Sequence, residues 1–182
     1  PRSTLFPYTT LFRSETAYLI QSSSMVGVRE TRHFRGDATL TEQDIMDARV
    51  FEDWVVARAH FNFDVHNLDG AGLDETGVQK HFRQRRGYTI PYGCLLPRGA
   101  EGLLLAGRNI SGTHMAHSSY RVMPICANMG QAAGIAAVLA SGSGRTPRQV
   151  AAAEIQAVLR SLGVDPEEPV ETAVKAKAAF AG

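Results

Sequence analysis

Two apolar runs, separated by a polar loop, dominate the chain between Leu103 and Ala140. The first is the short run Leu103–Ala106, which breaks at Gly107, and the second is an Ala- and Gly-rich run from Pro124 to Ala140. A short apolar run before a glycine predicts a buried strand, and the longer run predicts a buried helix that begins at its proline. A strand, a polar loop and a helix in this order predict an anion site at the helix N-terminus.

The pattern before these runs predicts shorter elements. Met25–His33 alternates apolar and polar residues, which predicts a strand that continues as a hairpin toward Leu40. Thr41, with Asp44 three residues later, is a typical N-cap signal, so we expect a helix from Glu42 to about Val50.

In the rest of the chain, some segments have a pattern that predicts one element, and one has a pattern that fits either a helix or a strand. Val50–His60 is apolar enough to form either a helix or a strand, whereas Phe61–Asp69 alternates and predicts a strand. Tyr88–Leu96 is rich in β-forming residues but is interrupted by proline and glycine, which favours an edge or bulged strand. Pro147 at a first helical position predicts a helix to about Leu162, ended by Gly163.

Composition narrows the class of protein. A chain of 182 residues with 44% hydrophobic and 20% charged residues has the length and balance of one soluble globular domain. A net charge of +1 argues against nucleic acid or an acidic membrane as a partner, and Pro124–Ala140 is short for a membrane span. Cys94 and Cys126 form no C-x-x-C motif, so we expect reduced buried thiols in a cytoplasmic protein without a signal peptide.

The first 14 residues differ in character from the rest of the chain. Leu5 to Ser14 is the translation that the codons CTC TTT CCC TAC ACG ACG CTC TTC CGA TCT would give, and this string resembles a common short-read sequencing adapter. The alternative is a genuine strand or hairpin that turns at Pro7. We expect residues 1–14 to be an artefact outside the fold, with coding sequence missing before Glu15.

Two arginines flank the predicted anion site. Arg121 precedes the helix that begins at Pro124, where a cation opposes the helix dipole at a cost of about 0.3–1 kcal/mol if exposed. This position is favourable if an anion or an electron-rich ring lies between Arg121 and the helix; the alternative is an arginine that points to solvent. Arg108 follows the predicted strand at its carboxyl end, where α/β sheets bind ligands, or it forms a structural ion pair.

Three histidines are candidates for a metal site. His66, His114 and His117 could form a metal site, but the last two lie in a predicted loop with no acidic residue between them, so we expect no metal. Hydroxyl groups near them do not form the G-x-S-x-G elbow of a hydrolase. Arg29 and Arg32 differ in phase along the predicted strand, so at most one of them would face a pocket.

Several runs of sequence, in order, resemble the C-terminal part of the FAD-dependent oxidoreductase family with a glutathione-reductase-like, two-dinucleotide-binding fold. The runs are GVRETRHFRGDATLT, YTIPYGCLLP, LLLAGRNISGTH, YRVMPICANMGQAAGIAA and SGRTPRQVAAAEIQAVLRSLG. The resemblance spans residues 15 to about 163. It implies an α/β or α+β fold in which residues 15–100 form part of a β-rich substrate region, residues 101–163 the C-terminal part of the FAD-binding domain, and residues 164–182 a linker and tail.

The resemblance also implies residue roles and FAD as the cofactor. The helix at Pro124 would point its N-terminus at the pyrimidine edge of the flavin, where its N–H groups stabilise negative charge. The cofactor-binding residues implied are Gly107, Arg108, Asn109, Arg121, Val122, Met123 and Gln131. On the substrate side the candidates are His66, His114, His117 and Arg29.

One departure from the family pattern lowers the FAD affinity and the activity that we expect of this chain. The sequence contains no G-x-G-x-x-G turn, which in such folds holds the ADP half of FAD. We therefore expect a truncated piece that partners the missing N-terminal part of its own FAD domain, and that alone binds FAD weakly and is inactive. The intact parent would move a hydride or electron pair between flavin and an unidentified small-molecule substrate. Alternatives are a non-catalytic binding module and a metal-dependent hydrolase that uses the three histidines.

Overall fold

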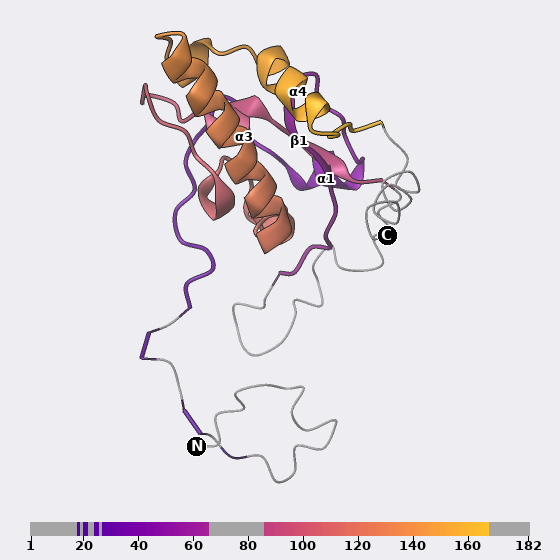
Figure 1. Ribbon diagram of the computed structural model, residues 1–182. Helices are drawn as coiled ribbons and strands as arrows, with labels where there is room; N and C mark the ends of the chain where they lie inside the picture. The colour runs from indigo at the N-terminus through magenta and orange to yellow at the C-terminus, as the bar shows by residue number, and fades with distance from the viewer. Residues whose placement is uncertain (1–17, 19, 22–23, 26, 66–85, 168–182) are drawn as a thin grey trace, which may run out of the picture.

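The computed structural model describes residues 18, 20–21, 24–25, 27–65 and 86–167, and Figure 1 shows their arrangement. Within these ranges the chain forms helices and one small sheet, a mixture consistent with the expected α/β or α+β class. The elements are α1 (Glu42–Met46), β1 (Trp54–Ala59), β2 (Tyr88–Pro91), α2 (His114–Tyr120), α3 (Met123–Gly142), α4 (Ala152–Ser161) and the 3-10 turns η1 (Tyr92–Leu95), η2 (Gly107–Asn109) and η3 (Pro147–Gln149).

The sheet is an antiparallel pair with an irregular register. Trp54 pairs with Pro91 and Ala59 with Tyr88, and the register shifts twice between them. Arg58 adopts a positive φ of 54°, and Gly87 lies so close that a Cβ there would come within 2.5 Å of the Arg58 backbone. This bulge therefore requires a glycine opposite Arg58. Because almost every residue of β1 is buried, the strand has no polar face, which is why its pattern also fitted a helix.

The helices α3 and α4 pack against β1 and against each other, as Figure 1 shows. The buried residues of α3 recur every three or four positions and form a single stripe: Ile125, Met129, Ala132, Ala136 and Ala140. The rest of α3 is largely exposed, including Val138, so the prediction of a fully buried helix is wrong in its burial although right in its structure. Gly130 and Gly134, four positions apart on α3, do not mark a close approach of another segment, since within the described chain a Cβ at either position would meet nothing.

Local capping signals were confirmed. Thr41 caps α1 in a reciprocal capping box with Asp44, and α1 ends at Met46, four residues earlier than predicted. The segment predicted as one helix from Pro147 is divided, because η3 gives way to two extended residues before α4 begins. Gly163, with a φ of +79°, follows α4 as expected for a helix stop.

Three predicted strands are corrected within the described residues. Met25–His33 and Leu103–Ala106 contain no strand, and residues 61–65 of the predicted strand Phe61–Asp69 contain none either. The predicted hairpin toward Leu40 is reduced to isolated bridges, one of which joins Leu40 to Gly112. These segments are extended but lack a continuous neighbour to pair with, and a strand needs a partner that local pattern cannot supply.

The helix α3 runs longer than the apolar run that predicted it. From Met123 to Gly142 it is long and apolar enough to cross a bilayer by length and composition alone, which corrects the judgement that the run is too short. Its buried stripe nevertheless packs against β1, α4 and the η2 and η3 turns, as the core helix of a globular domain does.

Candidate functional site

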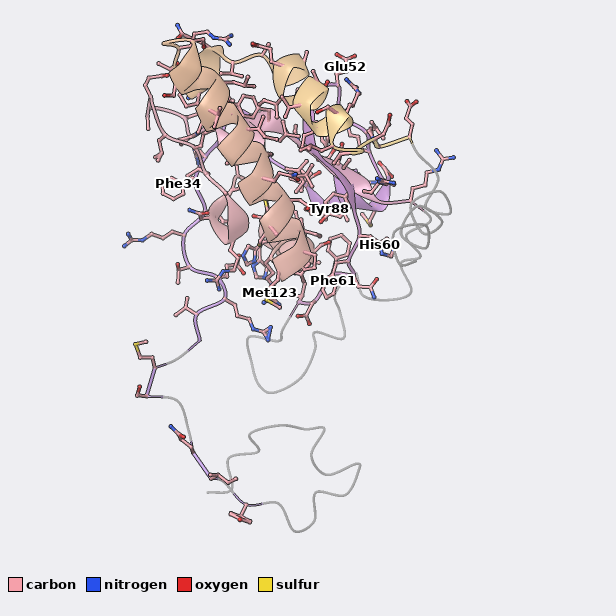
Figure 2. The ribbon with its side chains drawn as sticks, in the orientation of Figure 1. Phe34, Glu52, His60, Phe61, Tyr88 and Met123 are labelled. Carbon is pink, nitrogen blue, oxygen red and sulfur yellow. The ribbon has the colours of Figure 1, made fainter. Side chains whose placement is uncertain are left out.

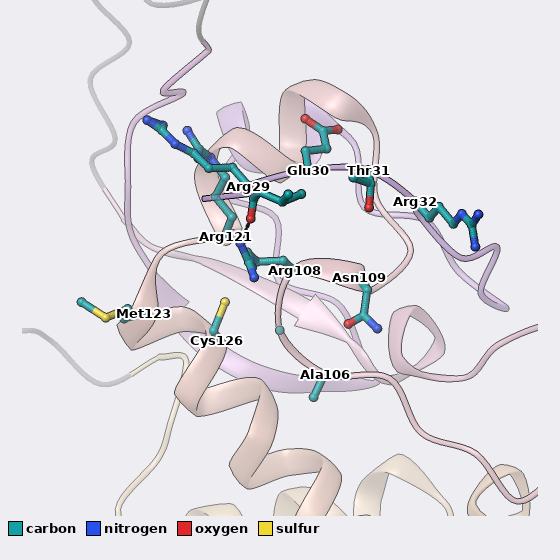
Figure 3. A pocket seen from close by; sticks show the side chains of 12 residues that line it. Arg29, Glu30, Thr31, Arg32, Ala106, Arg108, Asn109, Arg121, Met123 and Cys126 are labelled. Atoms are coloured by element: carbon teal, nitrogen blue, oxygen red, sulfur yellow. Dashed lines mark hydrogen bonds between the residues drawn. The ribbon is translucent and has the colours of Figure 1, made fainter. Parts of the chain in front are cut away.

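A pocket of about 700 Å³ lies beside the start of α3. Figure 3 shows how it is built: an irregular segment passes over it, the η2 turn forms one wall, and the first turn of α3 forms another. Its lining residues are Val28, Arg29, Glu30, Thr31, Arg32, Ala106, Gly107, Arg108, Asn109, Arg121, Met123 and Cys126. Four arginines against one glutamate make this lining strongly positive.

The start of α3 is open toward this pocket. Val122 occupies the N-cap position and offers no side-chain acceptor to the first N–H groups, and Pro124 lies within the first turn. A helix N-terminus leaves its first N–H groups without intrahelical partners, and it carries partial positive charge. The pocket therefore presents N–H donors and arginines to the same ligand, which suits an anionic group.

Arg121 is held beside this helix start by an acidic residue from a distant segment. Its guanidinium donates to the carboxylate of Asp64 at 2.8 Å and to the Asp64 backbone carbonyl at 2.9 Å. The same carboxylate lies 3.5 Å from Arg29. Burial and, after it, the charge of Arg29 lower the pKa of Arg121, while Asp64 opposes the shift. Asp64 thus supplies the anion that offsets the unfavourable position of Arg121 near the helix dipole.

A second pocket, of about 390 Å³, adjoins the first and shares three of its residues, Arg29, Glu30 and Arg121. It is completed by one acidic residue, one apolar residue and three residues of α2: Asp64, Val65, His114, His117 and Ser118. Three shared side chains mean that ligands in the two pockets would lie next to each other. Two adjoining pockets are the arrangement that a cofactor and its substrate require.

The helix α2 presents its histidines because of a local cap. Thr113 accepts a hydrogen bond from the Ala116 N–H, so His114 becomes the first helical residue and His117, three positions later, lies on the same face. The prediction that these histidines lie in a loop is therefore wrong. Behind α2, Gly112 lies against the ring of Tyr120, where a Cβ would come within 2.6 Å of a ring carbon.

Glu30 connects these histidines to the segment that crosses the pocket. His114 Nδ1 lies 2.9 Å from Oε1 and 2.8 Å from Oε2 of Glu30, and His117 Nδ1 lies 3.5 Å from Oε2. Burial raises the pKa of Glu30, but the hydrogen bond from His114 and the neighbouring imidazoles outweigh it and leave the pKa below its ordinary value. Glu30 is thus an ionised carboxylate in the wall of both pockets.

The predicted site residues divide into three groups. Gly107, Arg108, Asn109, Arg121 and Met123 line the first pocket, and Arg29, His114 and His117 line the second. Val122 and Gln131 line neither pocket, and Gln131 is exposed on α3. His66 lies outside the described residues.

Sequence reasoning missed Glu30, Asp64 and Cys126, and it allowed only one of Arg29 and Arg32. Both arginines line the first pocket, because their segment is irregular and does not alternate like a strand. The charged run from Arg29 to Arg32 was the available signal for Glu30. Asp64 had a weaker signal, as an acidic residue within an alternating apolar segment.

Comparison with known proteins gives one match. A family model described as FAD dependent oxidoreductase matches residues 4–159, which is most of the chain. Neither the curated proteins nor the solved structures contain a match. The match confirms the resemblance found in the sequence, and with it FAD as the cofactor that the family uses.

Proposed function

Because the chain belongs to the FAD-dependent oxidoreductase family, we propose that the first pocket holds FAD and the second holds a small-molecule substrate. A hydride or electron pair would pass between them. The observation that carries this proposal is the sharing of Arg29, Glu30 and Arg121 by the two pockets. FAD supplies the redox chemistry, and the protein supplies binding, orientation and electric field.

The residues of the first pocket fit an anionic cofactor. The uncapped N–H groups at the start of α3 and the guanidinium groups of Arg108 and Arg121 are donors that an anionic group can use. Arg108 itself donates to the Val28 carbonyl, which fixes its stem across the pocket. Gly107 has a φ of +78°, so the turn that carries Arg108 requires glycine.

The residues of the second pocket would orient a substrate and balance its charge. Arg29 and Arg121 share the single carboxylate of Asp64, so part of their positive charge remains available to an anionic substrate group. His114 is half exposed and reaches into the same space from the first turn of α2. The size of this pocket, about 390 Å³, and its charged side chains favour a small substrate that carries a polar or charged group.

The 182 residues contain no G-x-G-x-x-G turn, so this chain alone would hold the flavin half of FAD better than the ADP half. We expect weak binding of FAD and little or no turnover. A stoichiometric flavin spectrum in the purified protein would contradict this expectation.

Titration of FAD, followed by the quenching of its fluorescence, tests the first pocket. We expect weak, saturable binding that Arg108→Ala reduces on the order of tenfold, since a hydrogen bond to a charged group contributes about 1.5–3 kcal/mol. Arg160→Ala is the matched control, because Arg160 lies over the ring of Trp54 and lines neither pocket. Equal losses in the two variants, or no saturable binding, would remove the assignment of FAD to this pocket.

A further inference from the structure

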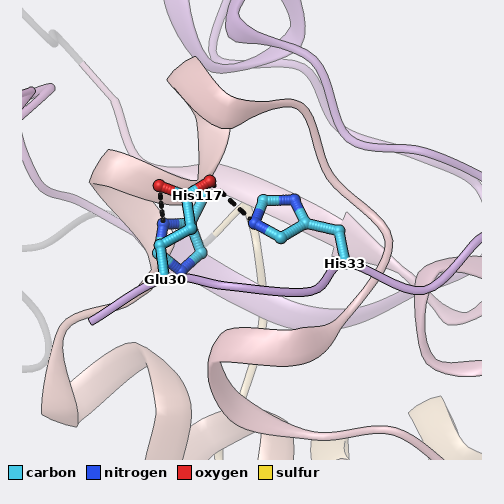
Figure 4. A group of neighbouring side chains, drawn as sticks. All are labelled: Glu30, His33 and His117. Carbon is cyan, nitrogen blue, oxygen red and sulfur yellow. Dashed lines mark ion pairs between the residues drawn. The ribbon is translucent and has the colours of Figure 1, made fainter. Parts of the chain in front are cut away.

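Glu30, His33 and His117 form a compact cluster, shown in Figure 4, and the proposed transfer of a hydride or electron pair assigns none of them a chemical step. Each side chain offers one ligand atom, and these atoms lie within 4.8 Å of one another. Glu30 and His33 come from the irregular segment over the first pocket, and His117 comes from α2. The cluster therefore joins two parts of the chain that are more than 80 residues apart.

The hydrogen bond of His33 fixes the state of its ring. His33 Nδ1 lies 2.9 Å from the Gly112 carbonyl oxygen, which can only accept, so Nδ1 carries the proton. Its other nitrogen, Nε2, lies 2.8 Å from Oε1 of Glu30. Within the described residues, Nε2 has no partner in hydrogen-bond geometry. A cation between this nitrogen and the carboxylate oxygen, either a metal ion or a second proton on the ring, would hold the two together.

His117 is the most buried member of the cluster. Its side chain is 1% exposed, and its Nε2 finds no hydrogen-bond partner in the part of the chain that the structure describes. A neutral imidazole is the form that binds a metal ion, and a buried nitrogen without a partner is uncommon in a folded protein.

We propose that Glu30, His33 and His117 bind one divalent transition-metal ion. Two imidazole nitrogens and one carboxylate form a donor set that Zn²⁺ and similar ions use in catalytic sites, with a further coordination position left open. The groups that orient such ligands are also present. The Gly112 carbonyl orients His33, and His114 donates to the Glu30 carboxylate.

The ion would have two effects on this protein. It would join the irregular segment to α2, because the free energy of metal binding becomes free energy of folding where the ligands come from separate segments. It would also lie at the wall of the second pocket, since Glu30 and His117 both line it. An oxygen atom of a small ligand could then complete the coordination. The metal site itself stands independently of FAD.

The experiment is a calorimetric titration of Zn²⁺ into the full chain without flavin. We expect one ion per chain, with affinity weakened on the order of 100-fold or more by Glu30→Gln and by His33→Ala, because removal of partners outside the ligand set already costs 10–100-fold. The matched control is His60→Ala, which removes an exposed imidazole outside both pockets and leaves the affinity unchanged. Because Glu30→Gln preserves the shape of the side chain, this variant should fold as the wild type does. A loss of Zn²⁺ affinity in it then reports the loss of the carboxylate ligand.

Two outcomes would overturn the proposal. One is the absence of stoichiometric Zn²⁺ binding; the other is binding that the Glu30→Gln and His33→Ala variants leave intact. Nitrogen-15 NMR of the imidazoles gives a second measurement. Zn²⁺ should move the Nε2 resonance of His33, whereas a His33 ring protonated on both nitrogens and indifferent to Zn²⁺ would mean that a proton fills the gap. Because both measurements omit FAD, their failure is separate from failure of the flavin proposal.

Discussion

Different forces hold together two regions of the molecule. One is the body, formed by β1, β2, α3 and α4; the other is the site, formed by residues 27–33, Asp64, α2 and Arg121. Figure 2 shows the body filled by side chains such as Tyr88, which is fully buried among apolar neighbours. In the site, Glu30 meets His114 and Arg121 meets Asp64, polar pairs that are 84 and 57 residues apart along the chain. The body depends on apolar area removed from water, and the site depends on a few directed charges. A change in the body should therefore lower the free energy of unfolding by more than a change in the site.

The largest expected effect comes from the body. Ile155, on α4, is fully buried, so Ile155→Ala removes core contacts and leaves a cavity, with a loss of about 2–5 kcal/mol in the free energy of unfolding. Urea denaturation measures this loss. Leu162→Ala, at the exposed end of the same helix, should change the free energy of unfolding by less than about 0.5 kcal/mol. Similar losses in both variants would mean that α4 does not belong to the core.

The next effect comes from the site. Asp64→Ala removes the carboxylate that Arg121 and Arg29 share, and it leaves the largely buried Arg121 guanidinium without that partner. We expect the free energy of unfolding to fall by about 1.5–3 kcal/mol, the usual contribution of hydrogen bonds to charged groups. Arg148→Ala, which removes surface pairs with Asp37 and Glu101, is the control and should cost clearly less than Asp64→Ala, because water and salt screen exposed pairs. Equal losses would show that the site pair is no more important than a surface pair.

The bulge between β1 and β2 gives a test of backbone crowding. A Cβ on Gly87 would come within 2.5 Å of backbone atoms of Arg58, which cannot rotate away as a side chain can. Gly87→Ala should therefore cost about 1–3 kcal/mol of stability. Gly99→Ala is a less crowded comparison, because Gly99 has open space around it and its cost comes from its positive φ alone. Thermal unfolding of both variants separates crowding from backbone strain.

The smallest effect concerns pH and the cap of α1. Burial raises the pKa of Asp44, but hydrogen bonds from Thr41 and Arg49 outweigh it and place the pKa below its ordinary value of 3.8. A carboxyl with a lowered folded pKa stabilises the protein above its unfolded pKa, and this stability is lost as the pH falls through the folded pKa. The advantage of the wild type over Asp44→Asn, about 1 kcal/mol at neutral pH, should begin to fall near pH 3.8 and disappear as the pH falls through the lower folded pKa. Urea midpoints measured from pH 6 to pH 2 give this difference.

The sequence correctly predicted those elements that depend on residues close together along the chain. The capping box of Thr41 and the apolar run after Pro124 are local signals, and both gave real helices. It failed for Leu103–Ala106, because a strand exists only if another segment lies beside it. It also missed the helix at His114. The helix α2 is too short to show an apolar period, and its local signal is the N-cap residue Thr113.

The site followed the same rule. The turn at Gly107 and the start of α3 could be placed from sequence, because their motifs are continuous. Glu30 could not, since the histidines that give it a role lie on a helix more than 80 residues away. The assignment of residues 15–100 and 101–163 to separate regions stays a prediction.

Gly112 contributes both to the packing of the body and to the geometry of the site. Its Cα leaves no room for a side chain against Tyr120, and its carbonyl holds the ring of His33. Among randomly mutated copies of the gene, changes at codon 112 should be rare in any population selected either for folding or for binding. Selection for folding and selection for binding should therefore both act on this one residue.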